Sequence, residues 1–227
     1  MKKELDTRWA KKCTGITQMQ RNMNKLLKQV SDDLVNKDEK TALTALVVRI
    51  IMRTSERVGN DESAKNGHYG ITGLLKWHVE FDEKGKWMNL NYVGKSGVLQ
   101  HKEVDIGSLG NFLLLPLLKR RKKNEFLFAT TEGVRIDRKK VNAYLAQFNI
   151  TAKDIRCYNC NELMLKSLRF SPTGKTPTER KRIFNDTLKK VAAYIGHGAP
   201  TLRNHYLIPS IENQYINEGT IKTNLKC

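Results

Sequence analysis

The 227-residue sequence contains no apolar run that approaches the length of a membrane-spanning helix, which needs about 20 consecutive apolar residues. Its first residues, 1–6, lack the apolar core of a signal peptide. We therefore expect a protein that is neither secreted nor inserted in a membrane. The expected location is the cytoplasm or nucleoid, or an infected cell if the protein is virus-associated.

Cysteines are few, and the four present are Cys13, Cys157, Cys160 and Cys227. Four cysteines in a chain of this length do not make a disulfide framework, which indicates a reducing compartment. Cys157 and Cys160 form a lone CxxC pair. A zinc site would need a second pair, or histidines at ligand spacing, so we expect no metal site.

Acidic residues are fewer than basic ones. The sequence has 23 Asp and Glu and 41 Lys and Arg, which gives a formal net charge of +18. Such an excess favours a polyanionic partner, and nucleic acid is the first candidate. The alternative is a basic protein with no polyanion to bind. The chain has no repeats or low-complexity linker, and it is long enough for one large domain or two small ones.

Helical periodicity dominates both ends of the chain. We expect a helix over 18–30 and a better-packed one over 39–57, whose apolar residues recur at helical spacing up to Ile51. Gly59 can adopt the left-handed conformation that closes a helix. This places Arg57 at the rim of the core.

Further helices are predicted in the second half of the sequence. They span 109–121, 137–148, a stretch that begins at Thr151, and 176–195. The last begins with Thr176, Pro177 and Glu179, which combine an N-cap, a proline at the first helical position and the acid of a capping box.

The middle of the chain changes to alternating periodicity. Residues 77–81, 87–93 and 98–104 alternate and are separated by glycine-containing turns, which predicts a small antiparallel meander. Residues 126–128 form a further short buried or edge strand. The second turn holds Lys95 between two glycines, where it could reach a bound ligand; the alternative is a solvent-exposed turn lysine. The fold class is α+β, mainly α.

A histidine and a tyrosine near the end of the chain suit chemistry on a phosphodiester. Helix 176–195 stops at Gly196, a loop carries His197, and a short second helix presents Tyr206. The phenol can act as a nucleophile, and the imidazole can donate a hydrogen bond to a phosphoryl oxygen. The alternative is that His197 is an ordinary cap residue and Tyr206 an ordinary half-buried aromatic.

Polar residues at the edges of other elements fit the same reaction. Two arginines, Arg57 and Arg156, can join His197 in stabilising the negative charge that develops on the non-bridging oxygens. Lys95 can protonate the leaving 5′ oxygen as a general acid. The guanidinium groups take the electrostatic role of a divalent ion, so neither a metal nor another cofactor is expected.

These residues lie in motifs that resemble those of the type IB DNA topoisomerases, whose catalytic domain is shared with the tyrosine recombinases. The motifs are Arg57-Val-Gly-Asn60, Tyr92-Val-Gly-Lys95-Ser-Gly97, Lys153-Asp-Ile-Arg156, Gly196-His197 and His205-Tyr206-Leu-Ile-Pro209. Recombinases usually have histidine where Lys153 stands, which favours the topoisomerases. The motifs occur in the family's order from Arg57 to about Gly219.

The resemblance implies a DNA breaking–rejoining enzyme fold that relaxes supercoiled duplex DNA without ATP or metal. Tyr206 would form a transient 3′-phosphotyrosyl link. It also implies one catalytic domain over 1–227, monomeric on DNA. That domain would be helical over 1–70 and 109–227 with the sheet over 75–105, and would lack the family's usual N-terminal clamp domain. The alternatives are a site-specific recombinase or integrase, and a non-catalytic DNA-binding domain of the same fold.

Other basic residues are candidate DNA contacts. Lys65 and Tyr69 follow Arg57 in what is predicted to be a loop, and Lys153 lies at a helix start, whose dipole favours phosphate. Three further candidates for phosphate contacts are Lys76, Lys175 and Arg203. The alternative for all of them is a solvent-exposed basic surface.

Overall fold

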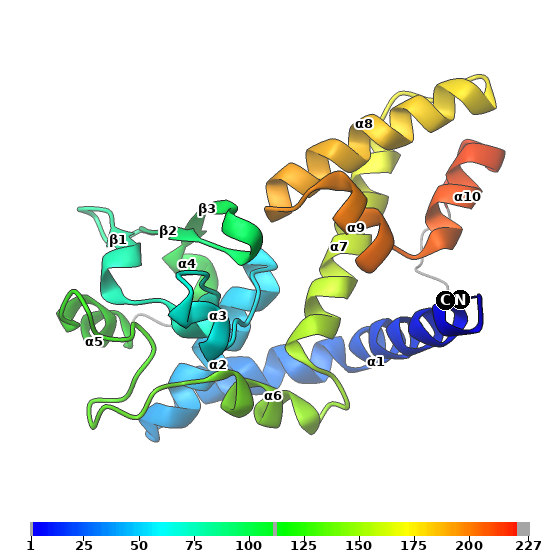
Figure 1. Cartoon of the computed structure of the whole chain (residues 1–227). Coiled ribbons are helices and arrows are strands. Elements are labelled where there is room, and N and C mark those ends of the chain that lie inside the picture. The colour runs from blue at the N-terminus through cyan, green and yellow to red at the C-terminus, as the bar shows by residue number, and fades with distance from the viewer. Residues whose placement is uncertain (1, 111–112, 222–227) are drawn as a thin grey trace. The chain divides into compact units, whose positions relative to one another are not determined.

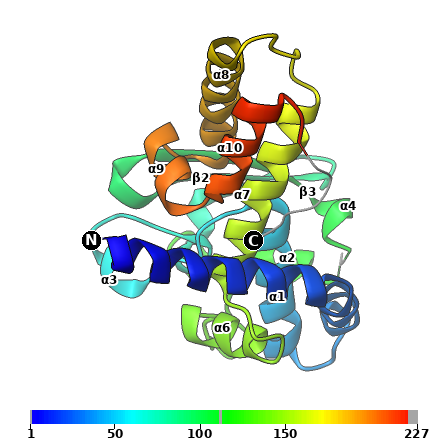
Figure 2. The same ribbon diagram turned by 90° about the vertical axis from the view of Figure 1, so that its right-hand side faces the viewer.

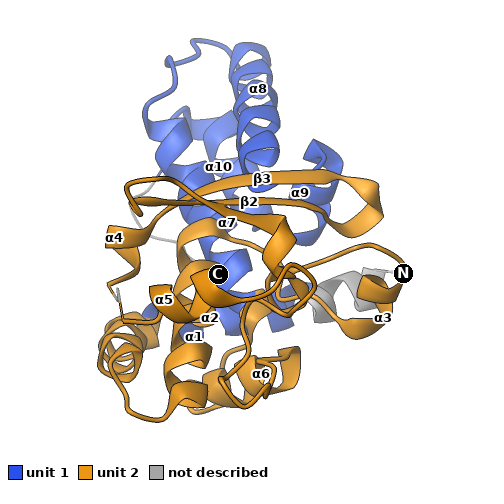
Figure 3. Cartoon of the chain, turned by 90° about the vertical axis from the view of Figure 1, so that its left-hand side faces the viewer, with its two compact units in different colours: residues 1–20, 154–227 blue, residues 21–153 orange. Residues whose placement is uncertain are grey.

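The computed structural model of the protein describes residues 2–110 and 113–221, so Met1 and Cys227 lie outside the described residues. The chain forms two compact units (Figure 3). Residues 21–153 make up the sheet unit, and residues 1–20 with 154–227 make up the helical unit. The described part is mainly helical with one small antiparallel sheet (Figure 1), which confirms the predicted fold class.

The sheet is a three-stranded antiparallel meander in the order β1-β2-β3, as predicted. Its strands are β1 (Val79–Phe81), β2 (Trp87–Val93) and β3 (Leu99–Asp105). The first strand is shorter than predicted because Trp77 belongs to a short 3-10 helix, η2 (Lys76–His78). Residues 126–128 do not join the sheet, since Phe126 pairs with Leu75 in an isolated bridge.

Helix α2 (Glu39–Thr54) is largely buried in the sheet unit. Its N-terminus is capped by the Asp38 side chain, which accepts a hydrogen bond from the Thr41 amide. The helix contacts α6 (Arg138–Ala146), α4 (Ile106–Leu109), the 3-10 helix η1 (Ile71–Gly73) and β3. The apolar residues predicted to face the core are buried, but so is every other residue from 42 to 51, so this stretch is buried on all sides rather than on one face.

The predicted end of α2 is wrong. The helix stops at Thr54, where Ser55 takes a left-handed conformation (φ 59°) and its amide bonds Ile51 O, so Arg57 lies in the following loop. Gly59 also has a positive φ, of 87°, but its role is close backbone packing. A Cβ on Gly70 would lie 2.5 Å from the Gly59 Cα. Two backbones cross there with no room for a side chain.

Other helix boundaries also differ from the predicted ones. The predicted helix 18–30 is part of the longer α1 (Lys2–Leu34), which contributes residues to both units. The predicted helix 109–121 is reduced to α5 (Leu115–Arg120), which has a proline in its first turn. The predicted loop that holds Lys65 contains a short helix, α3 (Asp61–Lys65). Asp137 caps α6 as predicted, accepting from the Lys140 amide.

The helical unit is built from α7 (Ala152–Arg169), α8 (Pro177–Ile195), α9 (Ala199–His205) and α10 (Pro209–Glu218). Helix α8 contacts both α9 and α10 (Figure 2). Apolar residues of all four helices, together with Ile16 of α1, form one core that also encloses Cys157 and Cys160. The predicted capping box is present, with Thr176 and Glu179 each bonding the other's backbone amide.

Candidate active site

Three of the predicted catalytic residues meet in the helical unit. Arg156, early in α7, is buried, with 3% of its surface exposed. Its Nη2 lies 2.7 Å from His197 Nε2, and its Nε donates to the same nitrogen at 3.3 Å. The loop position of His197 follows from Gly196, whose left-handed conformation (φ 77°) ends α8.

This contact determines the tautomer of His197. A guanidinium is always a donor, so Nε2 of His197 must accept. The neutral imidazole then carries its proton on Nδ1. In this arrangement Nε2 cannot donate to a phosphate until Arg156 turns its donors elsewhere.

Tyr206 stands beside this pair, directly after α9. Its ring centroid is 4.7 Å from that of His197, and the Arg156 guanidinium carbon lies 5.5 Å from it. The side chain is half-buried, so it is both supported by the core and open to solvent. A guanidinium at this distance places positive charge beside the aromatic ring.

The prediction from sequence missed Asn161, which holds the tyrosine segment in place. Its side chain is fully buried on α7. The amide nitrogen donates to Tyr206 O at 2.9 Å, and the amide oxygen accepts from the Ile208 amide at 2.8 Å. A signal was present in the sequence: Asn161 is a polar residue between Cys157 and Leu165, one helical turn from each, on the apolar face of α7.

The other two predicted catalytic residues belong to the sheet unit. Arg57 is half-buried in the loop after α2, and its carbonyl accepts from the Ile71 amide at 2.8 Å. Lys95 is exposed in the turn η3 (Lys95–Gly97) between β2 and β3. That turn is closed by the Gly94 amide bonding Val98 O at 2.8 Å.

The predicted DNA contacts differ in their surroundings. Lys65, Lys153 and Lys175 are exposed. Tyr69 stacks against His78 with ring centroids 4.3 Å apart. The Lys76 ammonium donates to Val79 O at 3.3 Å and remains only partly buried.

Arg203 has an intramolecular role. Its Nε lies 3.1 Å from Glu212 Oε2, its Nη2 bonds Asn185 Oδ1, and its guanidinium lies over the Phe184 ring at 5.7 Å. These contacts account for an arginine at this position. The Arg203 side chain is 38% exposed, and its contact with DNA stays a prediction.

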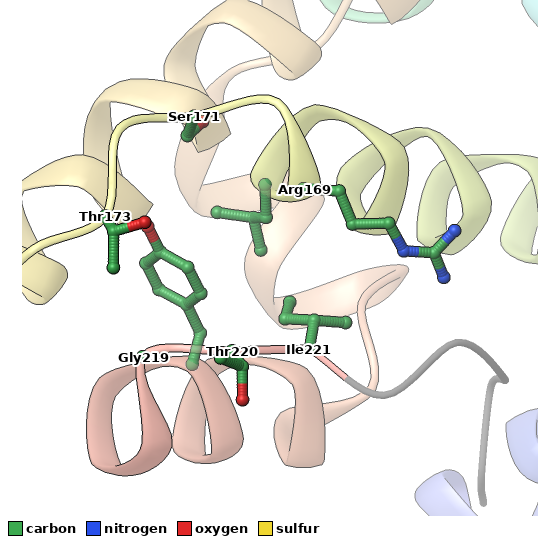
Figure 4. Close-up of a pocket in the computed structure, with 8 residues that line it drawn as sticks. Arg169, Ser171, Thr173, Gly219, Thr220 and Ile221 are labelled. Atoms are coloured by element: carbon green, nitrogen blue, oxygen red, sulfur yellow. The ribbon is translucent and has the colours of Figure 1, made fainter.

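A cavity of about 230 Å³ lies elsewhere in the helical unit (Figure 4). It is lined by Leu168, Arg169, Ser171, Thr173, Tyr215, Gly219, Thr220 and Ile221, none of which belongs to the predicted catalytic set. Within residues 2–110 and 113–221, no group of three or more His, Cys, Asp and Glu side chains could hold a metal ion. Among the same residues, no helix combines the length and apolar composition that a bilayer span requires.

Comparison with known proteins agrees with the sequence motifs. The chain is 24% identical over 211 residues to the DNA topoisomerase 1 of Rabbit fibroma virus (strain Kasza), covering 91% of this chain and 64% of the viral protein. The chain thus spans less than two thirds of that relative's length. The family model of the eukaryotic DNA topoisomerase I catalytic core matches residues 2–215. Because this match covers almost the whole sequence, the chain belongs to the eukaryotic DNA topoisomerase I catalytic-core family.

Proposed function

We propose that this chain is a type IB DNA topoisomerase, which relaxes supercoiled duplex DNA by transient cleavage of one strand. The observation that carries the proposal is the cluster of a buried Arg156, a loop His197 and a half-buried Tyr206. It combines a nucleophile with hydrogen-bond donors suited to a phosphate. Family membership and the net charge of +18 support the same reaction.

In the proposed cleavage step the Tyr206 phenol loses its proton to solvent water as its oxygen attacks a backbone phosphorus and forms a 3′-phosphotyrosyl bond. The bond to the 5′ oxygen breaks, and Lys95 protonates that oxygen as it leaves. Arg57, Arg156 and His197 stabilise the charge that develops on the non-bridging oxygens. Fixed donors in a partly buried site can contribute several kcal/mol to such a step.

The bond between Arg156 and His197 suggests how DNA prepares the site. A phosphate oxygen is a stronger acceptor for a guanidinium than a neutral imidazole is. We propose that the bound phosphate draws the Arg156 donors away from His197 Nε2. The neutral imidazole can then exchange its Nδ1 proton through solvent for one on Nε2 and donate a hydrogen bond from Nε2 to the phosphate.

After cleavage the broken end would rotate about the intact strand, and its 5′ hydroxyl would attack the phosphotyrosine to reseal the nick. The covalent link conserves the bond energy, so we expect no requirement for ATP, metal or another cofactor. We propose that the protein binds duplex DNA as a monomer. The proposed additional DNA contacts are Lys65, Tyr69, Lys76, Lys153, Lys175 and Arg203.

Supercoiled plasmid in the presence of EDTA provides the test. We expect relaxation in steps and a covalent protein–DNA adduct after a denaturant quench. Tyr206→Phe should abolish both but retain DNA binding. Tyr194→Phe is the matched control, since this tyrosine is 64% exposed on α8 of the same unit and should leave relaxation unchanged.

The same assay distinguishes the alternatives. Joint products between two plasmids that share a site would indicate a recombinase. Binding without nicking would indicate a non-catalytic DNA-binding domain. Either result from the unaltered chain would overturn the topoisomerase proposal.

A further inference from the structure

A buried hydrogen bond joins the two stretches of the sheet unit that carry proposed catalytic residues. The Tyr92 hydroxyl donates to the Glu56 carboxylate. The two residues are 4% and 2% exposed, respectively. Glu56 directly precedes Arg57, and Tyr92 stands three residues before Lys95. The bond therefore links the arginine loop to the end of the strand that leads into the lysine turn.

A second connection between these stretches runs through the backbone. The Ile71 amide bonds Arg57 O at 2.8 Å, and the Tyr69 amide bonds Val93 O at 2.8 Å. The segment 69–71 thus lies against the arginine loop at one end and against β2 at the other. The bond between Glu56 and Tyr92 is the direct side-chain contact that completes this arrangement.

The hydrogen bond between Glu56 and Tyr92 contributes little to the stability of the fold. Glu56 Oε1 is buried, and among the residues that the structure describes it has no hydrogen-bond partner. A buried polar atom without a partner destabilises the folded state. A pair of apolar side chains of similar volume would be as stable or more so. The polar pair instead fixes geometry, because a hydrogen bond sets the relative position and orientation of its two groups more strictly than apolar packing does.

The surroundings of Tyr92 hold its ring in one place. His78 meets it edge to face with centroids 6.3 Å apart, and His78 in turn lies against Trp77 at 3.8 Å and Tyr69 at 4.3 Å. Burial lowers the pKa of His78 to about 4, so this ring is neutral near pH 7. It offers no competing positive charge to the Glu56 carboxylate.

We propose that Glu56 and Tyr92 are positioning residues, whose buried hydrogen bond fixes the Arg57 loop relative to the Lys95 turn. This inference rests on the proposed function, because it gives Arg57 and Lys95 their roles on the phosphate. Neither Glu56 nor Tyr92 needs to touch DNA. They act by holding the backbone from which the two cations project.

The first test is Tyr92→Phe, which removes the bond and keeps the ring. We expect the single-turnover rate of covalent adduct formation to fall by about 10-fold to 100-fold, as when reacting groups are misplaced by roughly 1 Å. Binding of duplex DNA, measured with the additional change Tyr206→Phe so that no cleavage occurs, should be unchanged.

The matched control is Tyr144→Phe. Its hydroxyl donates to Asp33 Oδ2 at 2.7 Å, so it makes the same kind of tyrosine–carboxylate bond in the same unit, between α6 and α1. Both variants should lower the unfolding midpoint, and only Tyr92→Phe should slow cleavage. Equal cleavage rates in the two variants would show that the Glu56–Tyr92 bond is only structural.

Three further measurements distinguish a positioning role from a general loss of folded structure. A substrate with a 5′-thiol leaving group needs no general acid, so it should recover part of the rate lost in Tyr92→Phe, as in Lys95→Ala. Glu56→Gln keeps an acceptor for Tyr92 and should retain most of the rate that Glu56→Ala loses. The double variant Glu56→Ala with Tyr92→Phe should be no slower than the worse single variant.

The outcomes keep the two proposals apart. If the unaltered chain forms no covalent adduct, the proposed function fails and this inference fails with it. If the unaltered chain cleaves DNA but Tyr92→Phe cleaves as fast as Tyr144→Phe, only the positioning role is overturned. Additive losses in the double variant, or failure of Glu56→Gln to retain activity, would also contradict that role.

Discussion

At the scale of single residues, the sequence shows reactive or charged side chains at positions that the expected helices and strands leave accessible. Tyr206, His197 and Lys95 stand at a helix end, in a loop and in a turn, where such groups are available to a ligand. Asn161 and Glu56 escape this reasoning because their partners are distant in sequence. Asn161 bonds residues near 206, and Glu56 bonds Tyr92. Only the packed structure shows which polar groups they satisfy.

Asn161→Ala tests the role of the asparagine that holds the tyrosine segment. The change leaves the Ile208 amide without a buried acceptor, so we expect a loss of roughly 1–3 kcal/mol in the free energy of unfolding. We also expect slower adduct formation, because the Tyr206 backbone loses its anchor. Denaturant unfolding and single-turnover cleavage measure the two effects.

Asn22→Ala serves as the control for that experiment. The Asn22 side-chain amide donates to Phe148 O at 3.0 Å in the sheet unit, so this variant also loses a hydrogen bond between an asparagine side chain and the backbone. It should cost stability without slowing cleavage in the folded protein. If Asn161→Ala cleaves as fast as Asn22→Ala, the anchoring role is wrong.

His78 predicts a pH dependence of stability. Burial lowers its pKa from 6.5 to about 4, so the unfolded chain binds a proton in this range and the folded chain does not. The neutral His78 stabilises the folded state fully above pH 6.5. As the pH falls toward 4, the free energy of unfolding decreases by roughly 3 kcal/mol in total. Urea unfolding at about pH 7 and about pH 5 measures the change.

His78→Asn isolates this effect from the carboxylates that titrate nearby. The asparagine oxygen can accept the Leu75 amide hydrogen bond that His78 Nδ1 accepts at 2.9 Å, and it carries no titrating group. The variant should lose less stability on acidification than the unaltered chain. An identical pH dependence in both proteins would contradict the interpretation.

At the scale of elements, local signals predicted which helices and strands exist better than where they end. The predicted N-caps Thr176 and Asp137 are confirmed, because an N-cap depends only on residues within one helical turn. The end of α2 was wrong because Ser55, which carries no recognised stop signal, takes the left-handed conformation there. The helix predicted over 109–121 begins only near Leu115, so apolar composition alone did not set its start.

Thr176→Ala tests the contribution of the capping box at the start of α8. Its hydroxyl accepts from the Glu179 amide at 3.2 Å, and losing such a cap costs about 1 kcal/mol. We expect a lower thermal midpoint. Thr178→Ala, at an exposed position in the first turn of the same helix, should leave the midpoint unchanged or raise it; equal losses would rule out the cap as the cause.

At the scale of the whole molecule, the sequence predicts a polyanionic partner more readily than it predicts how separated stretches of the chain are arranged in space. The net charge of +18 is a sum over residues and needs no structure. That 1–227 acts as one catalytic domain remains a prediction. It depends on how residues from separated stretches gather on one phosphate, which neither periodicity nor composition determines.

The charge predicts a steep salt dependence of DNA binding. Each phosphate neutralised by Lys or Arg releases counterions, so affinity should fall linearly on a double-logarithmic plot with a slope of about −0.9 per contact. Fluorescence anisotropy with duplex DNA between about 50 mM and about 200 mM salt measures the slope. Replacing the exposed Lys153 with alanine should reduce the slope by about one contact. Binding that does not respond to salt would contradict a phosphate-based interface.

The crossing of Gly59 and Gly70 has a consequence for how this protein can diversify. The stems of the loop between them are pinned on both sides, since Arg57 O and Val58 O accept from the Ile71 and Thr72 amides. Exposed residues of the intervening α3, such as Lys65, can change in identity without shifting those stems. The proposed DNA contact at Lys65 can therefore be replaced in related proteins while the backbone that carries Arg57 keeps its position.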